Sequence, residues 1–159
     1  MNLDFASVWE MVADLVPEND ALICGEKIVS WKDYDLRSSK VASALVEAGL
    51  GPNSKAGLYL NNSNEYLIGQ NAIFKIGGVP INVNYRYVEE ELIYLLDNSD
   101  AEAVFYHACY SSRINEIAKS LPNIKAWIEV PDGSKSDFDQ SMQYEEILKN
   151  FSPMKRITR

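Results

Sequence analysis

The stretch "GGVPINVNYRYVEEEL", from Gly77 to Leu92, indicates the fold class of this chain. Two glycines lead into a short apolar run, and three glutamates then open an apolar pattern with helical spacing. A short strand followed by a helix is the unit of a parallel sheet, because parallel neighbours need a crossover connection. The glycines also raise the question of whether this corner binds a phosphate.

The same alternation of strand and helix extends to both sides of that stretch. The apolar runs predict strands in "KAGLYL", "VPINV", "AEAVFY" and "KAWIEV", the last being the final strand, and helices in "NNSNEYLIGQNAIFKIGG", "VEEELIYLLDNSD" and "SSRINEIAKSLPN". In the first of these helices, we expect Leu67, Ile68, Ile73 and Phe74 to face inward. Short strands separated by single helices are typical of right-handed crossovers. We therefore predict an α/β fold with a mostly parallel sheet and flanking helices.

Two further regions frame this sheet. Apolar residues at helical spacing predict a helix from Phe5 to Val16, "ALICGEKIVSW" predicts a small hairpin, and Ser30 with Asp33 predicts the start of a helix that ends at Gly49. After Val130 the chain is polar and turn-rich, with one short helix expected in "YEEILKNF". We predict an α/β subdomain over residues 1–130 and a loosely structured tail over residues 131–159.

Composition limits the class of protein. The chain has 159 residues, a formal net charge of −8 and 47% hydrophobic residues. The acidic balance argues against nucleic acid as a partner. The N-terminus lacks the basic start of a secretory signal, and no apolar run approaches the roughly 20 residues of a membrane span. We expect a soluble, cytoplasmic protein.

The cysteines, the histidine and the glycines form no recognisable metal-binding, phosphate-binding or catalytic motif. Cys24 and Cys109 permit one disulfide, but two buried thiols in a reducing compartment are the favoured interpretation, and no Cys/His cluster has the spacing of a metal site. The sequence has no P-loop and no GxGxxG; the nearest pattern, Gly49-Leu50-Gly51, precedes a strand. His107 follows a strand, where either a ligand-facing residue or a polar loop residue could lie, and the loop residue is favoured.

The glutamates at 89–91 leave a similar choice. Negative charge in a first helical turn complements the helix dipole, and this interpretation is favoured over paired acid–base catalysis. We predict no catalytic residue in this chain.

Arg86 is the residue with a functional interpretation of its own. It is the only basic residue between Lys75 and Arg113, and it follows a predicted strand at the carboxyl edge of the sheet. A guanidinium there could bind a phosphate through two parallel hydrogen bonds. The alternative is an ion pair with Glu89 or Glu90, three or four residues further on.

The run "GGVPINVNYRYVEEELIYLLDNSDAEAVFY" closely resembles the N-terminal portion of the AMP-forming acyl-CoA synthetases, which are adenylate-forming enzymes. The resemblance covers roughly residues 3–130 and continues more weakly through 144–148; the form "VPINVNYRY" is most similar to the fatty-acid and steroid-side-chain branch. It implies a ligase that uses ATP with Mg²⁺ to turn a carboxylic acid into an acyl-adenylate, and coenzyme A to turn the adenylate into a thioester.

The resemblance also implies that the chain lacks the catalytic apparatus. "SPMKRITR" resembles the stretch just before the family's Ser/Thr/Gly-rich ATP-binding loop. We therefore expect a fragment, inactive alone and binding no cofactor strongly, whose truncated sheet would allow self-association. In some relatives an arginine at the position of Arg86 contacts the 3′-phosphate of coenzyme A, with Asn84 and Tyr85 shaping the loop. Two alternatives stay open: a non-catalytic nucleotide- or coenzyme A-binding or interaction module, and part of an adenylating enzyme that serves a carrier protein.

Overall fold

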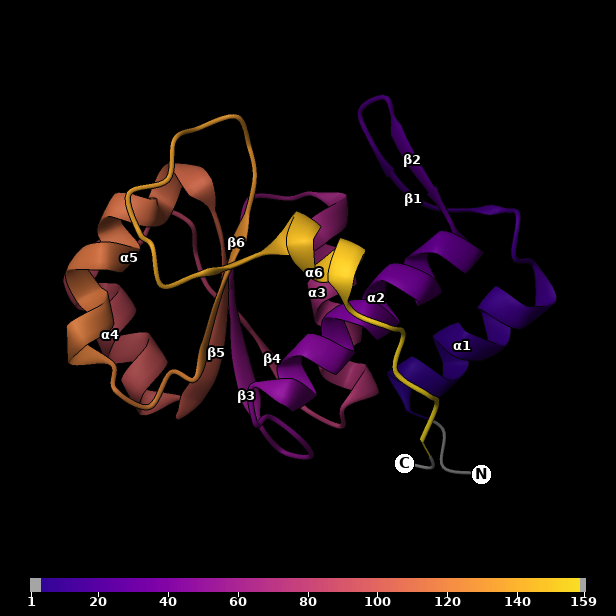
Figure 1. Ribbon diagram of the computed structural model, residues 1–159, viewed down its shortest axis with the longest axis horizontal. Coiled ribbons are helices and arrows are strands. Elements are labelled where there is room, and N and C mark those ends of the chain that lie inside the picture. Colours follow the sequence, from indigo (N-terminus) through magenta and orange to yellow (C-terminus); the bar gives the residue numbers. More distant parts are fainter. Residues whose placement is uncertain (1–3, 158–159) are drawn as a thin grey trace.

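The structure, a computed structural model that describes residues 4–157, has a five-stranded sheet between two layers of helices (Figure 1). Every neighbouring pair of strands in this sheet is parallel. The strands run in the order β4 (Val79–Asn82), β3 (Lys55–Tyr59), β5 (Ala101–His107), β6 (Ala126–Val130) and β7 (Met142–Gln143). The predicted α/β class is confirmed. "KAWIEV" is not the final strand, because the two-residue strand β7 adds to its edge.

Side chains alternate between the two faces of the sheet, and each face has its own core. Leu58 and Phe105 belong to the core under α2 (Trp31–Glu47), α3 (Asn64–Lys75) and α6 (Tyr144–Asn150). Tyr59 and Tyr106 belong to the core under α4 (Glu89–Asn98) and α5 (Ser111–Ile117), which two 3-10 turns flank, η1 (Ala108–Tyr110) and η2 (Ala118–Ser120). Helices on both faces are what a parallel sheet requires.

The inward face of α3 differs in one position from the prediction. Ile68 and Ile73 are fully buried, whereas Leu67 is 38% exposed, so its predicted inward placement was wrong. The buried positions Ile68, Ala72 and Lys75 follow the i, i+4, i+7 spacing of one helical face, and position 67 lies beside that face.

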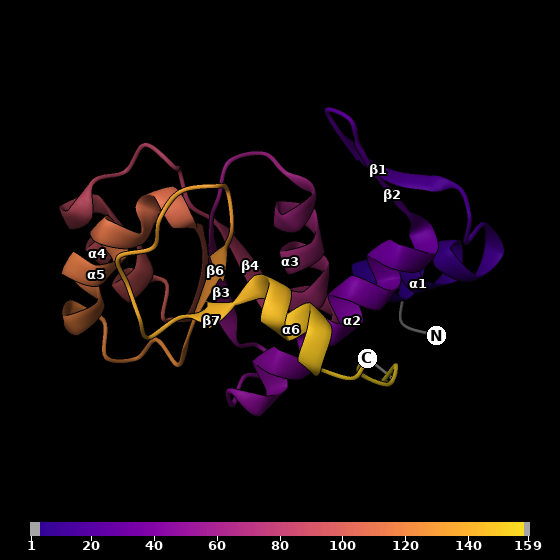
Figure 2. The same ribbon diagram turned by 45° about the horizontal axis from the view of Figure 1, so that its top comes forward.

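An N-terminal unit packs outside the helical layer. Helix α1 (Phe5–Leu15) contacts α2 and α3, and the antiparallel hairpin β1 (Asp20–Cys24) and β2 (Lys27–Ser30) extends away from the body in Figures 1 and 2. The hydroxyl of Ser30 caps α2 by accepting a hydrogen bond from the Asp33 N–H at 3.2 Å. The predicted helix, hairpin and cap are confirmed.

The Gly77-Gly78 corner ends α3 and turns the chain into β4. The N–H of Gly77 bonds to the Phe74 carbonyl and the N–H of Gly78 to the Ile73 carbonyl, both at 2.9 Å, which is the Schellman pattern. Gly77 has φ +73°, a conformation that costs glycine little. A Cβ on Gly78 would lie 2.8 Å from the Ser54 carbonyl oxygen. The glycines therefore serve the turn and its close packing.

The segment after β6 folds back over both cores. Phe138 is 4% exposed and meets the Trp127 ring edge-on, with ring centroids 5.9 Å apart. Further on, α6 forms where the sequence predicts a short helix, and Lys40 donates a hydrogen bond of 2.6 Å to the Leu148 carbonyl. The Met154 N–H bonds to the Ser39 carbonyl at 2.9 Å. Residues 148–154 are thus attached along α2.

Candidate functional site

The carboxyl ends of the parallel strands bring four polar residues to one edge of the sheet. Asn61 follows β3, Arg86 follows β4, His107 ends β5 and Asp132 follows β6. Ligands of open parallel sheets bind at this edge. Gly49-Leu50-Gly51 lies at the opposite edge, between α2 and the start of β3, which supports the view that it is no phosphate cradle.

Arg86 is exposed on a short loop whose backbone is held by its neighbours. The Asn84 side-chain oxygen accepts a hydrogen bond from the Arg86 N–H, and the Asn84 carbonyl accepts one from the Tyr87 N–H, both at 3.0 Å. The Arg86 guanidinium lies 5.5 Å from the centre of the Tyr85 ring, within cation–π range. Asn84 thus closes the turn, and Tyr85 lies beside the cation.

The ion pair considered for Arg86 is not formed. Glu89 pairs instead with Arg113 of α5, with 2.9 Å between Oε1 and Nε, and within residues 4–157 no carboxylate pairs with Arg86. Its own backbone hydrogen bond and the Arg113 guanidinium lower the pKa of Glu89. The Arg86 side chain is therefore exposed and without a carboxylate partner within residues 4–157, at the carboxyl edge of the sheet.

Arg113 connects three groups around this loop. Its Nη1 donates hydrogen bonds to the Tyr59 hydroxyl at 2.7 Å and to the Tyr87 carbonyl at 3.0 Å. The Tyr59 hydroxyl in turn donates to the same Tyr87 carbonyl at 3.1 Å. Burial raises the pKa of Tyr59, so its hydroxyl stays protonated and can donate this bond. This arrangement could not be predicted from the sequence, because no local pattern connects residues 59, 87 and 113.

The glutamates at the start of α4 serve the helix, as expected. The Glu91 carboxylate accepts a hydrogen bond of 3.0 Å from the Val88 N–H, and Glu89 is engaged by Arg113. Both lie in the first turn, where negative charge complements the helix dipole. This use of two of the three carboxylates supports the structural interpretation over acid–base catalysis.

His107 links the ends of two strands. It is 6% exposed, and its Nδ1 accepts a hydrogen bond of 3.1 Å from the Asn61 N–H. Burial lowers the pKa of His107, against the opposing effect of the Asp132 and Glu65 carboxylates. A neutral imidazole that accepts a backbone hydrogen bond fits the structural interpretation.

The two cysteines are free and both are exposed, so the expectation of buried thiols was wrong. Cys24 borders the turn of the projecting hairpin, and Cys109 lies in η1. Although the residue as a whole is exposed, partial desolvation of its thiol group, followed by the Asp132 carboxylate, raises the pKa of Cys109 to about 11. This thiol stays protonated near neutral pH, which makes it a poor nucleophile.

Among residues 4–157, the burial of several charged residues was not predicted from the sequence, and Glu129 and Lys75 are the most deeply buried of them. Glu129 is 3% exposed and accepts hydrogen bonds from the Tyr106 hydroxyl, the Ser136 hydroxyl and the Gln143 amide. Lys75 is 1% exposed and lies between carboxylates of α1 and α2. Its spacing of seven residues from Ile68 was a usable signal for burial, whereas nothing in the sequence marks Glu129.

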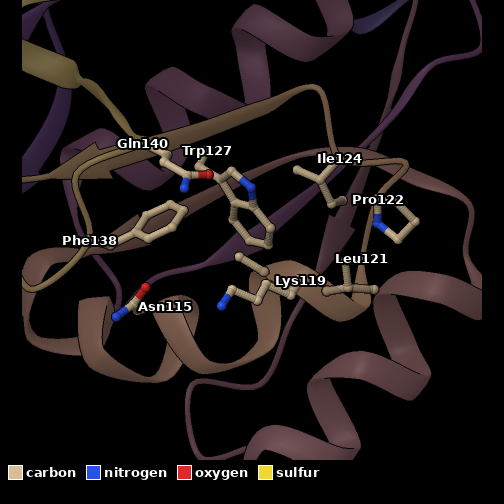
Figure 3. A pocket seen from close by; sticks show the side chains of 9 residues that line it. Asn115, Lys119, Leu121, Pro122, Ile124, Trp127, Phe138 and Gln140 are labelled. Carbon is tan, nitrogen blue, oxygen red and sulfur yellow. The ribbon is translucent and has the colours of Figure 1, made fainter.

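The pocket in Figure 3 lies away from the Arg86 loop, between the end of α5 and the segment after β6. It has a volume of about 230 Å³, with the rings of Trp127 and Phe138 on one side and the side chains of Asn115 and Lys119 on the other. A second hollow of about 330 Å³ adjoins the loop and includes Glu90 among its lining residues, with Tyr87, Glu91, Tyr94 and Leu95. Its carboxylates disfavour an anion there. Neither hollow holds a nucleophile paired with a base.

The described part of the chain contains no cluster of His, Cys, Asp or Glu side chains suited to a metal ion. None of the helices in residues 4–157 is long and apolar enough to cross a bilayer. The candidate site is the exposed Arg86 guanidinium together with the loop that carries it.

Comparison with known proteins identifies the family. Residues 9–155 match the AMP-binding enzyme family, so the chain belongs to it, and the resemblance to its N-terminal region is confirmed. The chain is 38% identical over 155 residues to a 3-oxocholest-4-en-26-oate–CoA ligase of Rhodococcus rhodochrous, with 96% of this chain and 28% of the relative covered.

A second relative gives the same result. It is a medium/long-chain-fatty-acid–CoA/3-oxocholest-4-en-26-oate–CoA ligase of Mycobacterium marinum, 38% identical over 136 residues, covering 86% of this chain and 25% of the relative. The chain thus spans about a quarter of the length of these relatives. The fold matches that of an anthranilate CoA ligase solved with anthranoyl-AMP, with a TM-score of 0.86, 16% identity, and coverage of 96% of this chain and 29% of that chain.

Proposed function

We propose that this chain is the N-terminal part of an AMP-forming ligase that converts a carboxylic acid, of the fatty-acid or steroid-side-chain type, into its coenzyme A thioester. The observation that carries the proposal is the 38% identity to two ligases whose names state such acids. In this reaction the acid carboxylate attacks the α-phosphorus of ATP and displaces pyrophosphate to give the acyl-adenylate, and the coenzyme A thiol then attacks the acyl carbon and displaces AMP.

We further propose that the 159-residue chain has no ligase activity of its own. The glycine pairs of this chain serve turns, and Cys109 and His107 are not arranged as nucleophile and base. An ATP–pyrophosphate exchange assay with a panel of fatty and steroid-side-chain acids tests both proposals. We expect exchange from the full gene product and none from residues 1–159.

The outcomes separate the two proposals. Robust exchange by residues 1–159 would overturn the claim of inactivity. A gene that continues past Arg159 into a Ser/Thr/Gly-rich loop, but whose product activates none of the acids, would contradict the ligase assignment. A stop codon directly after Arg159 would favour the non-catalytic binding module instead.

Arg86 is proposed as a contact for the 3′-phosphate of coenzyme A. Three observations support this role: the guanidinium is exposed, it has no carboxylate partner within residues 4–157, and the Asn84 side chain holds its backbone. A hydrogen bond between charged groups is worth roughly 10- to 100-fold in affinity. We expect Arg86→Gln to raise the KM for coenzyme A by about tenfold while adenylate formation is retained.

A matched control removes a charge elsewhere on the surface. Lys32 forms a solvent-exposed pair with Glu18 at 3.6 Å, so Lys32→Gln also removes one positive charge. This control should leave the KM for coenzyme A unchanged. Equal loss of both half-reactions in Arg86→Gln would indicate a structural role and would contradict the proposed contact.

A further inference from the structure

We propose that Arg113 is a positioning residue that fixes the loop of residues 84–88 and thereby sets the direction of the Arg86 side chain. This inference rests on the proposed function of Arg86. It goes beyond that function because Arg113 lies on another helix and contacts the loop only through the Tyr87 carbonyl and the neighbouring Glu89.

The anchor is a single planar group with two nitrogens in use. Nε donates to the Glu89 carboxylate, while Nη1 donates to the Tyr59 hydroxyl and the Tyr87 carbonyl. A guanidinium holds several acceptors in a fixed geometry, which an ammonium does not. The side chain is only 29% exposed, and α5 is itself held in the core by Ile114 and Ile117. Arg113 therefore fastens the loop to a rigid element.

The anchored backbone is adjacent to Arg86. On one side the Arg86 N–H is held by the Asn84 side chain, and on the other the Tyr87 carbonyl accepts bonds from both Arg113 and Tyr59. Together these bonds hold the chain before and after the Cα of Arg86. Such fixing of a ligand-contacting group reduces the entropy lost on binding.

Arg113 has a second, electrostatic consequence. Glu89 is only three residues from Arg86, and its carboxylate is 41% exposed. Without Arg113 this carboxylate would be free to pair with Arg86 or to repel an approaching phosphate. Pairing with Arg113 at 2.9 Å leaves Arg86 available to an anion.

The first test measures amide hydrogen exchange in the loop, using the full gene product. We expect Arg113→Gln to accelerate amide hydrogen exchange in residues 84–92 by about tenfold, because the loop loses its anchor. The matched control is Lys125→Gln, which removes the Lys125–Glu102 ion pair before β6, at the opposite edge of the same sheet. It should leave exchange in this loop unchanged. Unchanged exchange in Arg113→Gln would overturn the proposal.

The second test measures the consequence for the ligand. We expect Arg113→Gln to lower the ratio of kcat/KM for coenzyme A to that for 3′-dephospho-coenzyme A by about tenfold, with ATP–pyrophosphate exchange retained. Arg113→Lys keeps the positive charge but lacks the planar guanidinium. Its ratio should lie between those of the parent enzyme and Arg113→Gln. In an Arg86→Gln background, Arg113→Gln should have no further effect, because both changes act on one contact.

The outcomes distinguish this inference from the function on which it rests. If Arg86→Gln leaves the ratio of kcat/KM for coenzyme A to that for 3′-dephospho-coenzyme A unchanged, the coenzyme A assignment is wrong. Amide exchange in the loop then alone decides the role of Arg113. If Arg86→Gln lowers this ratio but Arg113→Gln leaves it unchanged, the positioning role of Arg113 is wrong. Should Arg113→Gln fail to fold, Tyr59→Phe removes one donor to the Tyr87 carbonyl and Glu89→Gln removes the ion pair, and both must accelerate loop exchange for the proposal to stand.

Discussion

The Lys75 ammonium lies 2.8 Å from the Glu10 carboxylate, joining α3 to α1 across 65 residues of sequence. A second carboxylate, Asp35 of α2, lies 2.6 Å from the same ammonium. Arg156 extends the network from the C-terminal segment, because it binds Asp35 and holds Asp14 through two hydrogen bonds of 2.6 and 2.9 Å. Charges therefore hold the N-terminal helix and residues near the C-terminus to the same helices.

The first prediction concerns the centre of this network. Lys75→Met keeps an unbranched side chain, one atom shorter, but removes the ammonium that pairs with the Glu10 carboxylate, which is 8% exposed. We expect the free energy of unfolding to fall by about 3 kcal/mol, because the buried ammonium no longer offsets the charges of the Glu10 and Asp35 carboxylates. Urea denaturation of the 159-residue chain measures it.

A double variant is the control for that prediction. In Lys75→Met combined with Glu10→Met, the buried carboxylate that paired with Lys75 is removed together with the ammonium, so part of the lost stability should return. A double variant that loses the sum of the two single effects would show that the contact is not an interacting pair. Lys32→Gln, at an exposed pair, should change stability by less than about 1 kcal/mol.

The alternation of strands and helices could be predicted because it depends on the spacing of apolar residues that are close in the sequence. Apolar residues in runs or at helical intervals report which face of an element is covered, and capping residues such as Ser30 mark helix starts. Strand β7 could not be predicted in this way. It has two residues in a polar segment, and it exists only because Met142 and Gln143 pair with β6.

The candidate site was predictable only in part, for a related reason. The position of Arg86 after a strand was visible in the sequence, but whether a nearby carboxylate pairs with it was not. Glu89 lies only three residues after Arg86, yet it pairs with Arg113, 24 residues further on. The competition between two arginines for one carboxylate depends on packing between α4 and α5, which no local pattern encodes.

The second prediction tests the tight corner at Gly78. A Cβ there would lie 2.8 Å from the Ser54 carbonyl oxygen and 3.0 Å from the Ile73 Cγ2 atom, so Gly78→Ala forces the backbone apart. We expect a loss of about 1–3 kcal/mol in the free energy of unfolding, measured by urea denaturation. Gly51→Ala is the matched control, because a Cβ at Gly51 meets nothing within 4 Å and should be tolerated. Equal stability of the two variants would contradict the close approach of Ser54 to this corner.

The third prediction concerns the buried carboxylate of Glu129. Its oxygens accept hydrogen bonds from Tyr106 at 2.9 Å and from Ser136 at 2.6 Å, and Gln143 donates at 3.3 Å. An amide cannot accept at both ends, so Glu129→Gln should cost about 1–3 kcal/mol of stability. Amide exchange should also accelerate in residues 131–143, because Ser136 and Gln143 attach this segment to β6 through Glu129. Glu102→Gln, at the more exposed pair with Lys125, is the control and should have a smaller effect on both measurements.

The fourth prediction follows from the burial of His107, the only histidine in the chain. Burial lowers the pKa of His107 in the folded state below its ordinary value of about 6.5, so the unfolded chain binds the proton more readily. Its contribution to stability is therefore fully present above about pH 6.5 and is lost as the pH falls through the folded-state pKa. Proton NMR of the single imidazole should show a titration midpoint below that of a free histidine.

The matched variant for this prediction is His107→Asn, which keeps an acceptor for the Asn61 N–H but cannot titrate. Urea denaturation across pH 5–8 should show a smaller loss of stability toward acid pH in this variant than in the parent chain, because the carboxylates contribute equally to both. A parent and variant with the same pH dependence, or an imidazole that titrates above its ordinary value, would mean that the Asp132 and Glu65 carboxylates outweigh burial at this position.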